Sequence, residues 1–534
     1  MTAEAAFDYE VIAVGAGPTG ILAANLLGRL GVRTLVFDRE QDIVTIPRAV
    51  GICEEGSRIL DAAGLLDEDL GKFHPINNVL FVNRQLQPQF HSDFDWRKDG
   101  YRAIRMFHQP ELERDMRRAL QRYDSVDLWC GAELGGFTDH GEAVAVSVIR
   151  DGQRRELRCR FLLGCDGASS PVRKALGIGF SGSTYPQDWV ILDIENNPLP
   201  SNNIAFSINP ERPSVTLPGP GGRRRWEFVV KKNDDVEHIF DEANIMRLLS
   251  PWGDMSGVTV SRRALYTFHA RTAEHYRRDN VFLLGDAAHI TPPFAGQGMM
   301  AGLRDAHNLC WKLAAVLRGR AGEALLDSFE AERIPQSKQI IGFAQFVGSI
   351  VLPQGRLTAG IRDAVFRVLG WLGVHSPAEG LTVRKLPNHI NGSLLRHALV
   401  SRFRGTGVEL PQHELDTPCG RRVPSDQLLG ERFNILGWNT DPTEWVSAPT
   451  LDRWQRSGGG FTTLTSGEHF ETRADLLLDR SRHFRNSFAA GRRLLVMRPD
   501  KMIVLRCRPG ELDGKLNRYL DRIGCAALPC QEPI

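Results

Sequence analysis

The stretch Gly15-Ala16-Gly17-Pro18-Thr19-Gly20 carries the pattern G-x-G-x-x-G. It follows residues 9–14, an apolar run typical of a buried strand, and it opens residues 19–30, in which leucines recur at helical spacing. Residues 33–37 predict a second strand. The chain therefore opens with a strand–helix–strand unit, whose right-handed crossover makes the two strands parallel.

Each glycine of this stretch has its own use in binding a dinucleotide. Gly15 permits the tight turn, Gly17 lets the backbone approach a pyrophosphate, and Gly20 lets the helix pack closely on the strand. The helix N-terminus then offers free N–H groups and a positive dipole to the phosphates. Asp38 ends the second strand, where a carboxylate can accept hydrogen bonds from the adenosine ribose, and Arg39 beside it is a further candidate contact. The acid is compatible with either FAD or NAD.

The composition is that of a globular protein with no preference for polyanions. With 534 residues the chain is too long for one core, so two or three domains are expected. The 66 Lys and Arg residues nearly balance the 64 Asp and Glu residues, so the chain has no strong positive field that would attract a polyanion. We therefore do not expect nucleic acid as a partner. The start of the chain lacks a basic segment, and no uninterrupted apolar run reaches about 18 residues, so we expect a cytoplasmic protein without an integral membrane segment.

The nine cysteines form no CxxC pair and no metal-ligand spacing, which favours a reducing compartment and no metal site.

One basic run has two readings. Arg223-Arg224-Arg225 directly follows a Pro- and Gly-rich stretch, residues 218–222, which favours the tip of a solvated hairpin loop. The alternative is a contact with a phosphate or a dinucleotide.

Changes of pattern along the chain predict an α/β fold in which one domain is threaded through another. The segments with strand–helix character form a Rossmann-like dinucleotide-binding domain of residues 1–78, 106–182 and 268–345. Short alternating stretches broken by Pro and Gly predict an inserted antiparallel sheet that binds substrate, in residues 79–105 and 183–267. A helical linker region, residues 346–420, and a separate small α/β domain, residues 421–534, complete the prediction.

Two further short motifs stand in order after the glycine-rich turn. The first is Gly164-Cys165-Asp166-Gly167-Ala168, and the second, in residues 283–293, reads Leu-Leu-Gly-Asp-Ala-Ala-His-Ile-Thr-Pro-Pro. They are similar to the D-G and G-D motifs of the flavoprotein aromatic hydroxylases, the group that includes para-hydroxybenzoate hydroxylase. The resemblance implies that the dinucleotide is FAD, bound tightly but without a covalent bond. Asp166-Gly167 alone would be typical of a turn.

The resemblance assigns roles to residues of both motifs. In that family the acid of the G-D motif binds the ribityl chain of the flavin, which implies this role for Asp286, beside Gly285. The acid of the D-G motif, here Asp166, is linked to both FAD and the pyridine nucleotide. Pro293 closes the matching G-D segment.

A long helix, residues 299–317, begins just after this segment. If the flavin edge meets its N-terminus at Gly298 and Met299, the N–H groups and dipole can stabilise the negative charge that reduced flavin carries at N1 and O2. The family usually has Asn where this sequence has Met300, so the side chains beside the flavin are expected to differ.

Two more segments match the family register. Arg48 lies in residues 47–51, which match the segment whose Arg approaches the FAD pyrophosphate, and Gln109 matches the Gln near the flavin chain. Unanchored, either side chain would be an ordinary surface residue.

Within the family the resemblance is greatest to the 3-(3-hydroxyphenyl)propionate hydroxylases and extends along nearly the whole chain. It includes residues 190–194, 266–271, 305–313 and 498–500. The last of these resembles a C-terminal thioredoxin-like domain; without CxxC, a structural or dimer-contact role is expected there, so a homodimer is one hypothesis. One departure is Cys53-Glu54-Glu55, where those hydroxylases typically carry two adjacent aspartates, and it indicates an altered pocket.

The resemblance implies an activity. NADH or NADPH, as a transient co-substrate, reduces FAD; O2 adds at flavin C4a; and the terminal hydroperoxide oxygen attacks a small phenolic aromatic acid, ortho to its hydroxyl, in aromatic catabolism. Three alternatives stay open: a tailoring hydroxylase of a larger aromatic polyketide, a flavin-dependent reductase or dehydrogenase without oxygen insertion, and a non-catalytic flavin-binding partner protein.

A base or relay near the phenol oxygen would make the substrate a better nucleophile. Glu54, Tyr266 and His269 are the candidates. Without a catalytic role, Glu54 would be a solvated acid, Tyr266 a core aromatic residue and His269 a core histidine with satisfied hydrogen bonds.

Overall fold

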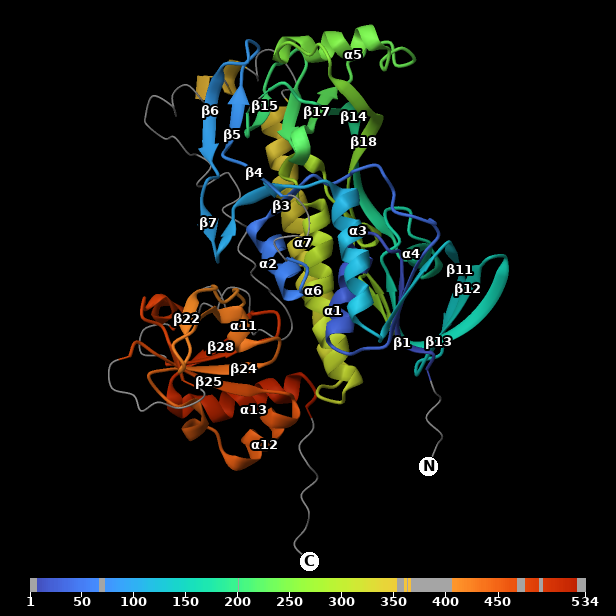
Figure 1. The fold of residues 1–534 in the computed structure, drawn as a ribbon. Coiled ribbons are helices and arrows are strands. Elements are labelled where there is room, and N and C mark those ends of the chain that lie inside the picture. The colour runs from blue at the N-terminus through green and yellow to red at the C-terminus, as the bar shows by residue number, and fades with distance from the viewer. Residues whose placement is uncertain are drawn as a thin grey trace, which may run out of the picture.

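The structure is a computed structural model of the chain. It describes residues 7–66, 73–199, 201–352, 360–362, 364–365, 406–467, 476–488 and 493–525. Figure 1 shows α6 (Gly298–Leu317) and α7 (Ala324–Val351) through the centre, an antiparallel sheet at one end and a C-terminal α/β domain, coloured orange to red, beside the first domain. This arrangement confirms the predicted fold class. Most of residues 346–420, the predicted helical linker region, lie outside the described residues.

The first sheet has the strand order β10-β2-β1-β13-β12-β11, and β20 also pairs with β13. Pairings β10–β2, β2–β1, β1–β13 and β13–β20 are parallel, whereas β12 and β11 are antiparallel additions. The strands are β1 (Tyr9–Val14), β2 (Thr34–Asp38), β10 (Val126–Cys130), β11 (Ala132–Asp139), β12 (Val144–Arg150), β13 (Gln153–Gly164) and β20 (Val281–Leu283). The near-continuous burial of β1, β2, β20 and the last four residues of β13 is typical of parallel strands covered on both faces.

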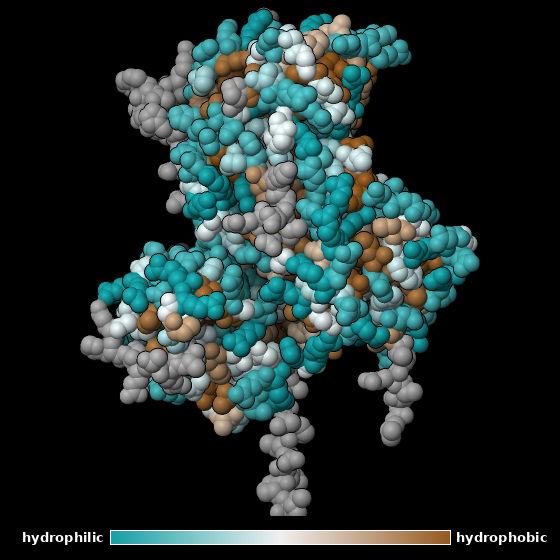
Figure 2. Space-filling model, viewed as in Figure 1, coloured by the Kyte–Doolittle hydropathy of each residue, from teal (hydrophilic) through white to brown (hydrophobic). Residues whose placement is uncertain are grey.

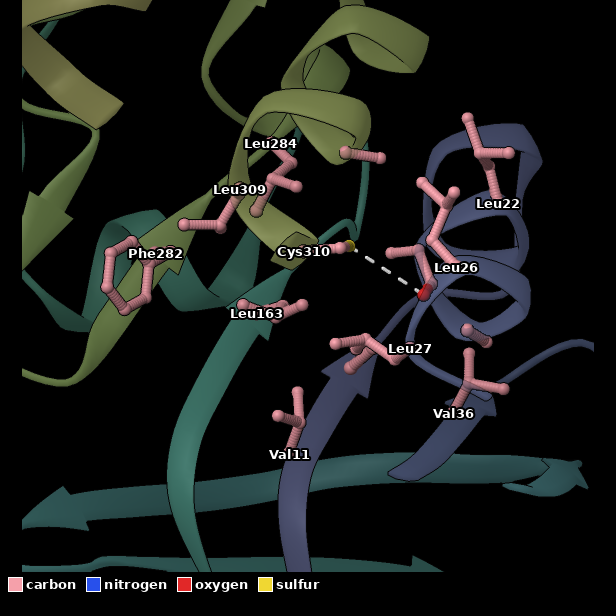
Figure 3. Packing of buried hydrophobic residues seen from close by; sticks show 14 of the residues in the cluster. Val11, Leu22, Leu26, Leu27, Val36, Leu163, Phe282, Leu284, Leu309 and Cys310 are labelled. Atoms are coloured by element: carbon pink, nitrogen blue, oxygen red, sulfur yellow. Dashed lines mark hydrogen bonds between the residues drawn. The ribbon is translucent and has the colours of Figure 1, made fainter. Parts of the chain in front are cut away.

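Helix α1 (Pro18–Arg29) begins with a proline at its first position, where the missing N–H costs no helical hydrogen bond. Its leucines pack on the sheet and on α6, as Figure 3 shows for Leu26 and Leu27 near Cys310 of α6. The Cys310 thiol donates to the Ala23 carbonyl across the contact between α1 and α6, with Sγ and O separated by 3.7 Å. This core fixes α1 and α6 on either side of the glycine-rich turn.

The second sheet has the order β21-β18-β14-β17-β16-β15-β5-β6 and is antiparallel except for β15 and β5. Its strands are β5 (Asn78–Val82), β6 (Pro88–Asp93), β14 (Phe180–Glu195), β15 (Ile204–Ser207), β16 (Ser214–Pro218), β17 (Arg224–Val229), β18 (Thr259–Ala273) and β21 (His289–Ile290). The outer face packs Val190, Leu192, Trp226 and Phe228 under α5 (Glu242–Leu249). The face that carries Trp189, Val229 and Phe268 packs on Phe294 of the first domain, and we call it the inner face.

The interpretation of Arg223–Arg225 as a solvated loop tip is wrong for two of the three arginines. Arg224 and Arg225 lie in β17 and are 3% and 4% exposed. Arg225 makes a bidentate ion pair with Asp193, its direct neighbour on β14. The turn is formed by residues 219–222, and the strand begins immediately after it, so paired carboxylate and carbonyl acceptors overcome the usual preference of arginine for solvent.

The C-terminal sheet has the order β23-β22-β26-β25-β24-β27-β28 and carries α12 (Ala448–Arg456) and α13 (Leu512–Arg522). Its strands are β22 (Glu414–Asp416), β23 (Arg422–Pro424), β24 (Asn434–Trp438), β25 (Gly460–Thr465), β26 (Leu476–Leu478), β27 (Leu494–Met497) and β28 (Ile503–Cys507). A buried ion pair joins it to the first domain: Arg498 contacts Glu332 of α7, which also pairs with Lys312 of α6, and all three side chains are fully buried. Although burial opposes the charge, Arg498 and Lys312 lower the pKa of Glu332 to about 2.

The surface shown in Figure 2 is mostly hydrophilic, and its hydrophobic residues form small separate groups. Across the described ranges, no helix has both the length and the apolar character to cross a membrane. The same ranges hold no group of three or more His, Cys, Asp or Glu side chains suited to a metal ion.

Candidate functional site

Strand pairing brings the three sequence motifs to one edge of the first sheet. Val14 is in register with Gly164, and Gly164 is in register with Leu283. Because these strands are parallel, the turns that follow them, residues 15–20, 165–170 and 285–288, lie side by side at the carboxyl ends of β1, β13 and β20. We call these three the cofactor turns. A crevice outside the carboxyl ends of parallel strands is where open α/β sheets bind ligands.

The glycine-rich turn has the backbone geometry that its sequence predicts. Gly15 has φ +100°, and a Cβ there would lie 2.4 Å from the Cys165 carbonyl oxygen. A Cβ at Gly20 would lie 1.9 Å from the Gly15 carbonyl oxygen, so only glycine permits this packing of helix on loop. A Cβ at Gly17 would meet nothing within 4 Å. Gly17 therefore presents open backbone at the N-terminus of α1, as close approach of a pyrophosphate requires.

Asp38, at the end of β2, contacts the backbone of the glycine-rich turn. Its Oδ2 accepts a hydrogen bond from the Ala16 N–H at 2.7 Å, and its Oδ1 accepts one from the Glu40 N–H at 3.0 Å. The carboxylate thus holds the glycine-rich turn against the end of β2. The Arg39 side chain is 73% exposed and contacts Glu40, so it lies at the rim of the site.

The backbone of residues 47–49 is held from both sides, and the Arg48 residue is exposed. Gln109, the first residue of α3 (Gln109–Ala119), accepts from the N–H groups of Arg48 and Ala49 at 2.8 and 2.6 Å. From the sheet, Arg225 donates to the carbonyls of Pro47 and Arg48 at 2.6 and 3.0 Å, and Arg262 donates to that of Pro47. The two predicted residues Arg48 and Gln109 therefore meet through the backbone.

Asp166 lies directly after β13, and only one of its two carboxylate oxygens accepts a hydrogen bond from a described residue. Its Oδ2 accepts from the Val172 N–H at the start of α4 (Pro171–Ala175) at 2.9 Å, whereas its Oδ1 is buried with no hydrogen-bond partner among the described residues. Burial raises the pKa of this carboxyl. An unpaired buried acceptor at the cofactor edge is suited to a ligand hydroxyl or amide.

Asp286 lies in the neighbouring turn, which Asp305 of α6 holds in place. Asp305 is fully buried and its Oδ2 accepts from the Gly285 N–H at 2.9 Å and from His289 Nε2 at 2.7 Å, while its Oδ1 accepts from Arg333. Gly285 has φ +60°. Within the described ranges no group donates a hydrogen bond to Asp286, and burial raises the pKa of its carboxyl.

The N-terminus of α6 completes this side of the site. Pro293 is exposed, and Gly298 and Met299 are the first two residues of the helix, so their N–H groups have no partner within it. Met300 is fully buried, and its Sδ would lie 2.4 Å from a Cβ on Gly56 of α2 (Glu54–Ala62). The methionine that replaces the family's usual Asn therefore packs against α2.

The inner face of the second sheet presents an aromatic cluster to this edge. Trp189 packs on Phe268 and Phe294 with ring centroids 5.3 and 5.9 Å apart, and Tyr185 and Tyr266 pack around them. Phe294 directly follows Pro293, so the cluster adjoins the α6 side of the cofactor edge. The indole Nε1 of Trp189 is buried without a hydrogen-bond partner among the described residues.

The three candidate bases do not converge. Tyr266 faces inward, with its ring 5.9 Å from the Arg262 guanidinium carbon. His269 stands on the opposite face of β18, because successive side chains of a strand alternate, and its Nδ1 lies 2.9 Å from Thr184 Oγ1 at the surface. Glu54 is 4% exposed at the start of α2, next to Glu55, which pairs with Arg304 of α6 at 2.7 Å.

Sequence reasoning missed several polar residues of this region. Trp189 and Glu227 stand in strands whose alternating pattern was recognised, but the pattern alone does not say which face of the sheet packs on the first domain. Arg117, near the end of α3, donates to the Ala16 carbonyl at 3.1 Å, and only its place in the last turn of a helix after Gln109 could have signalled it.

The residues present fit FAD. One edge of the sheet offers partners for a pyrophosphate and for ribityl hydroxyls. These are the open backbone at Gly17, the Asp166 Oδ1 and the Asp286 carboxylate, and neither the Asp166 Oδ1 nor the Asp286 carboxylate receives a hydrogen bond within the described ranges. Comparison with known proteins decides the cofactor: the family described as FAD binding domain matches residues 8–344.

The chain belongs to this FAD-binding family. A second family, described as HcaD C-terminal domain, matches residues 407–522. This FAD-dependent protein is 32% identical over 97% of its length to a 3-(3-hydroxy-phenyl)propionate/3-hydroxycinnamic acid hydroxylase of Klebsiella pneumoniae subsp. pneumoniae, of which 95% is covered. It is 36% identical, over 85% of its length and 84% of the relative, to a hydroxylase of the same name from Burkholderia cenocepacia.

Solved structures agree on the fold. The flavin-dependent monooxygenase PieE, in complex with FAD and substrate, matches 97% of this chain and 100% of its own with a TM-score of 0.79 at 21% identity. Aklavinone-11 hydroxylase, with FAD and aklavinone, matches 97% of this chain and 99% of its own with a TM-score of 0.78 at 22% identity. The protein is a flavoprotein aromatic monooxygenase with the fold of the aromatic hydroxylases, as its sequence predicts.

Proposed function

We propose that this monooxygenase consumes NADH or NADPH and O2 to hydroxylate a small phenolic aromatic acid ortho to its hydroxyl, with 3-(3-hydroxyphenyl)propionate as the type substrate. The observation that carries the proposal is the aromatic cluster of the inner face, which adjoins the cofactor edge and holds an unpaired indole donor. The names of the full-length relatives at 32–36% identity support the substrate class.

In this proposal the cofactor supplies hydride acceptance and oxygen activation, and the chain supplies position, charge and dryness. Asp286 and Asp166 orient the cofactor through its hydroxyl and amide groups, and Gly17 receives the pyrophosphate. The N-terminus of α6 stabilises negative charge that the cofactor gains. Trp189, Phe268 and Phe294 exclude water from the reacting ring, and the Trp189 N–H binds an oxygen of the substrate.

A larger aromatic polyketide is the second candidate substrate. The matches to aklavinone-11 hydroxylase and, at 25% identity over 97% of this chain, to an anhydrotetracycline hydroxylase favour it. The phenolic acid remains our choice because the relatives named for it are more similar in sequence. We also propose a cytoplasmic location, because the eight cysteines in the described ranges are all free thiols.

The experiment is a screen of NADH and NADPH oxidation by the FAD-loaded protein. We expect 3-(3-hydroxyphenyl)propionate or a close phenolic acid to accelerate the oxidation and to yield a catechol. Stimulation by polycyclic phenols alone would assign the second candidate, and oxidation that no phenol accelerates would overturn both.

A further inference from the structure

Glu227 is a buried acid in the middle of the inner face. On β17 it is in register with Ile191 of β14 and Val215 of β16, and it is 8% exposed. The aromatic cluster lies toward one end of this face, and the Arg225–Asp193 pair lies toward the other. Trp189 is its diagonal neighbour across the two strands, at roughly 7–8 Å between Cα atoms by ordinary sheet geometry. The two residues are thus close enough for one aromatic substrate to contact both.

The charged groups around Glu227 are already committed to other partners. Arg225 of β17 and Arg262 of β18 both contact Asp193 of β14 and both donate to the Pro47 carbonyl, and Arg225 also donates to the Arg48 carbonyl. Tyr266 of β18 packs with the aromatic cluster, and β16 contributes Val215 and Leu217, which do not titrate.

Glu227 consequently receives no hydrogen bond from any residue in the described ranges. Burial raises the pKa of its carboxyl, and only the positive charges of Arg225 and Arg262 oppose that shift. A buried carboxyl without a donor is costly unless a ligand completes it, and a raised pKa brings a general base toward the pH at which it works best.

We propose that Glu227 is the catalytic base that accepts the proton of the substrate's phenol group. The inference rests on the proposed function, because it needs a phenolic substrate on the inner face. It assigns the base to a residue that lies between the Trp189 indole and the Arg225–Asp193 pair.

The step is balanced within the site. The phenol O–H bond breaks, its electron pair stays on oxygen, and the proton passes to the Glu227 carboxylate, so the net charge is unchanged. The ortho carbon of the electron-rich ring then forms a C–O bond to the hydroxyl oxygen that the cofactor supplies, while the bond from that oxygen to the rest of the cofactor breaks. When the ring regains aromaticity, its ortho C–H proton leaves and neutralises the negative charge left on the cofactor, and Glu227 returns its proton to the original phenol oxygen. The carboxylate is thereby restored for the next turnover.

The test measures product formation by FAD-loaded Glu227→Gln against pH. Glutamine keeps the shape but accepts no proton, so we expect hydroxylation at neutral pH to fall about 100- to 10,000-fold, with cofactor oxidation diverted to hydrogen peroxide. Wild-type hydroxylation should rise with pH as Glu227 ionises. The variant's rate should instead rise only as the phenol itself ionises, near pH 10 for an ordinary phenol. Ring-fluorinated phenols, which ionise at lower pH, should rescue it.

Asp188→Asn is the matched control, since Asp188 is a carboxylate of β14 on the opposite face, bonded to Thr267 Oγ1. It should leave the pH profile unchanged. Glu227→Asp, which keeps a proton acceptor, should retain more activity than Glu227→Gln and the wild-type form of the profile. An unshifted profile and no rescue by fluorinated phenols in Glu227→Gln would overturn the proposal, as would loss of FAD from both variants, which would make the carboxylate a structural counter-ion. A wild-type protein that hydroxylates no phenol would refute the proposed function instead.

Discussion

The cofactor turns lie at the ends of parallel strands, whereas the residues that we propose to contact substrate lie along antiparallel strands of the inner face. In the turns, backbone geometry decides where each residue lies. A Cβ added at Gly15, Gly20 or Gly285 would meet another atom within 3 Å. In the second sheet, the alternation of side chains along a strand decides which residues lie on the inner face. Tyr266 and His269 are three residues apart and therefore point to opposite faces. The comparison teaches that a short motif specifies a cofactor contact, while a substrate contact depends on the register of strands distant in sequence.

The largest expected effect separates packing from ligand contact within one turn. Gly20→Ala places a Cβ against the Gly15 carbonyl, so we expect the unfolding free energy to fall by about 1–3 kcal/mol and FAD to be lost on purification. Gly17→Ala meets no protein atom within 4 Å, so the FAD-free protein should change by less than about 0.5 kcal/mol while its FAD affinity still falls. Chemical denaturation and FAD titration measure the two quantities. Unchanged FAD affinity in Gly17→Ala would refute the pyrophosphate contact.

Asp286→Ala tests the acid of the third cofactor turn. Loss of a charged hydrogen-bond acceptor should weaken FAD binding about 10- to 100-fold, measured by flavin fluorescence. Asp124→Ala is the control, because this exposed acid precedes β10 at the opposite edge of the sheet. A variant that purifies with full FAD would exclude the ribityl contact.

The raised pKa of Asp286 adds a pH dependence to the same contact. A carboxylate accepts hydrogen bonds only while ionised, so wild-type FAD affinity should fall as pH decreases, and it should begin to fall at a higher pH than an ordinary aspartate, with a pKa of about 3.9, would give. Asp286→Asn should lack this component. An identical profile in both proteins would assign the dependence to another acid.

Arg225→Lys tests the contact by which the substrate sheet holds the Arg48 segment. Lysine cannot reproduce the bidentate pair with Asp193 and the bonds to two carbonyls, so FAD affinity should fall about 3- to 10-fold. Arg212→Lys is a matched control, because Arg212, in the loop before β16, makes a similar bidentate pair with Asp234, in the loop after β17, but does not contact residues 47–49. Equal losses in both variants would point to general weakening of the sheet.

The smallest expected effect belongs to the substrate side. Trp189→Phe keeps the aromatic packing and removes the unpaired N–H, so KM for the phenolic acid should rise about 3- to 10-fold while FAD affinity stays constant. Trp226→Phe supplies the comparison on the outer face, since its buried indole nitrogen is also unpaired. If KM rises equally in both, the indole does not bind substrate.

The geometry of the cofactor turns was predictable from sequence because it depends on residues that are neighbours in the chain. Gly15, Gly17 and Gly20 stand in a fixed order between one strand and one helix, and Asp166 and Asp286 each follow a strand end. The inner face was not predictable to the same degree. The burial of Arg225 depends on Asp193 and on the Pro47 carbonyl, which lie 32 or more residues away in the chain. Glu227 gains its setting only when β14, β16 and β17 pair.

The central claim is that this protein uses FAD to insert oxygen into a phenol. Turnover of the FAD-loaded protein with NAD(P)H, 3-(3-hydroxyphenyl)propionate and 18O-labelled O2 tests it most directly by mass spectrometry of the product. We predict that each product molecule carries one labelled oxygen atom, as a new hydroxyl group on its ring, and that one NAD(P)H is consumed for each product molecule formed. An unlabelled substrate with all reducing equivalents recovered as hydrogen peroxide would contradict the account.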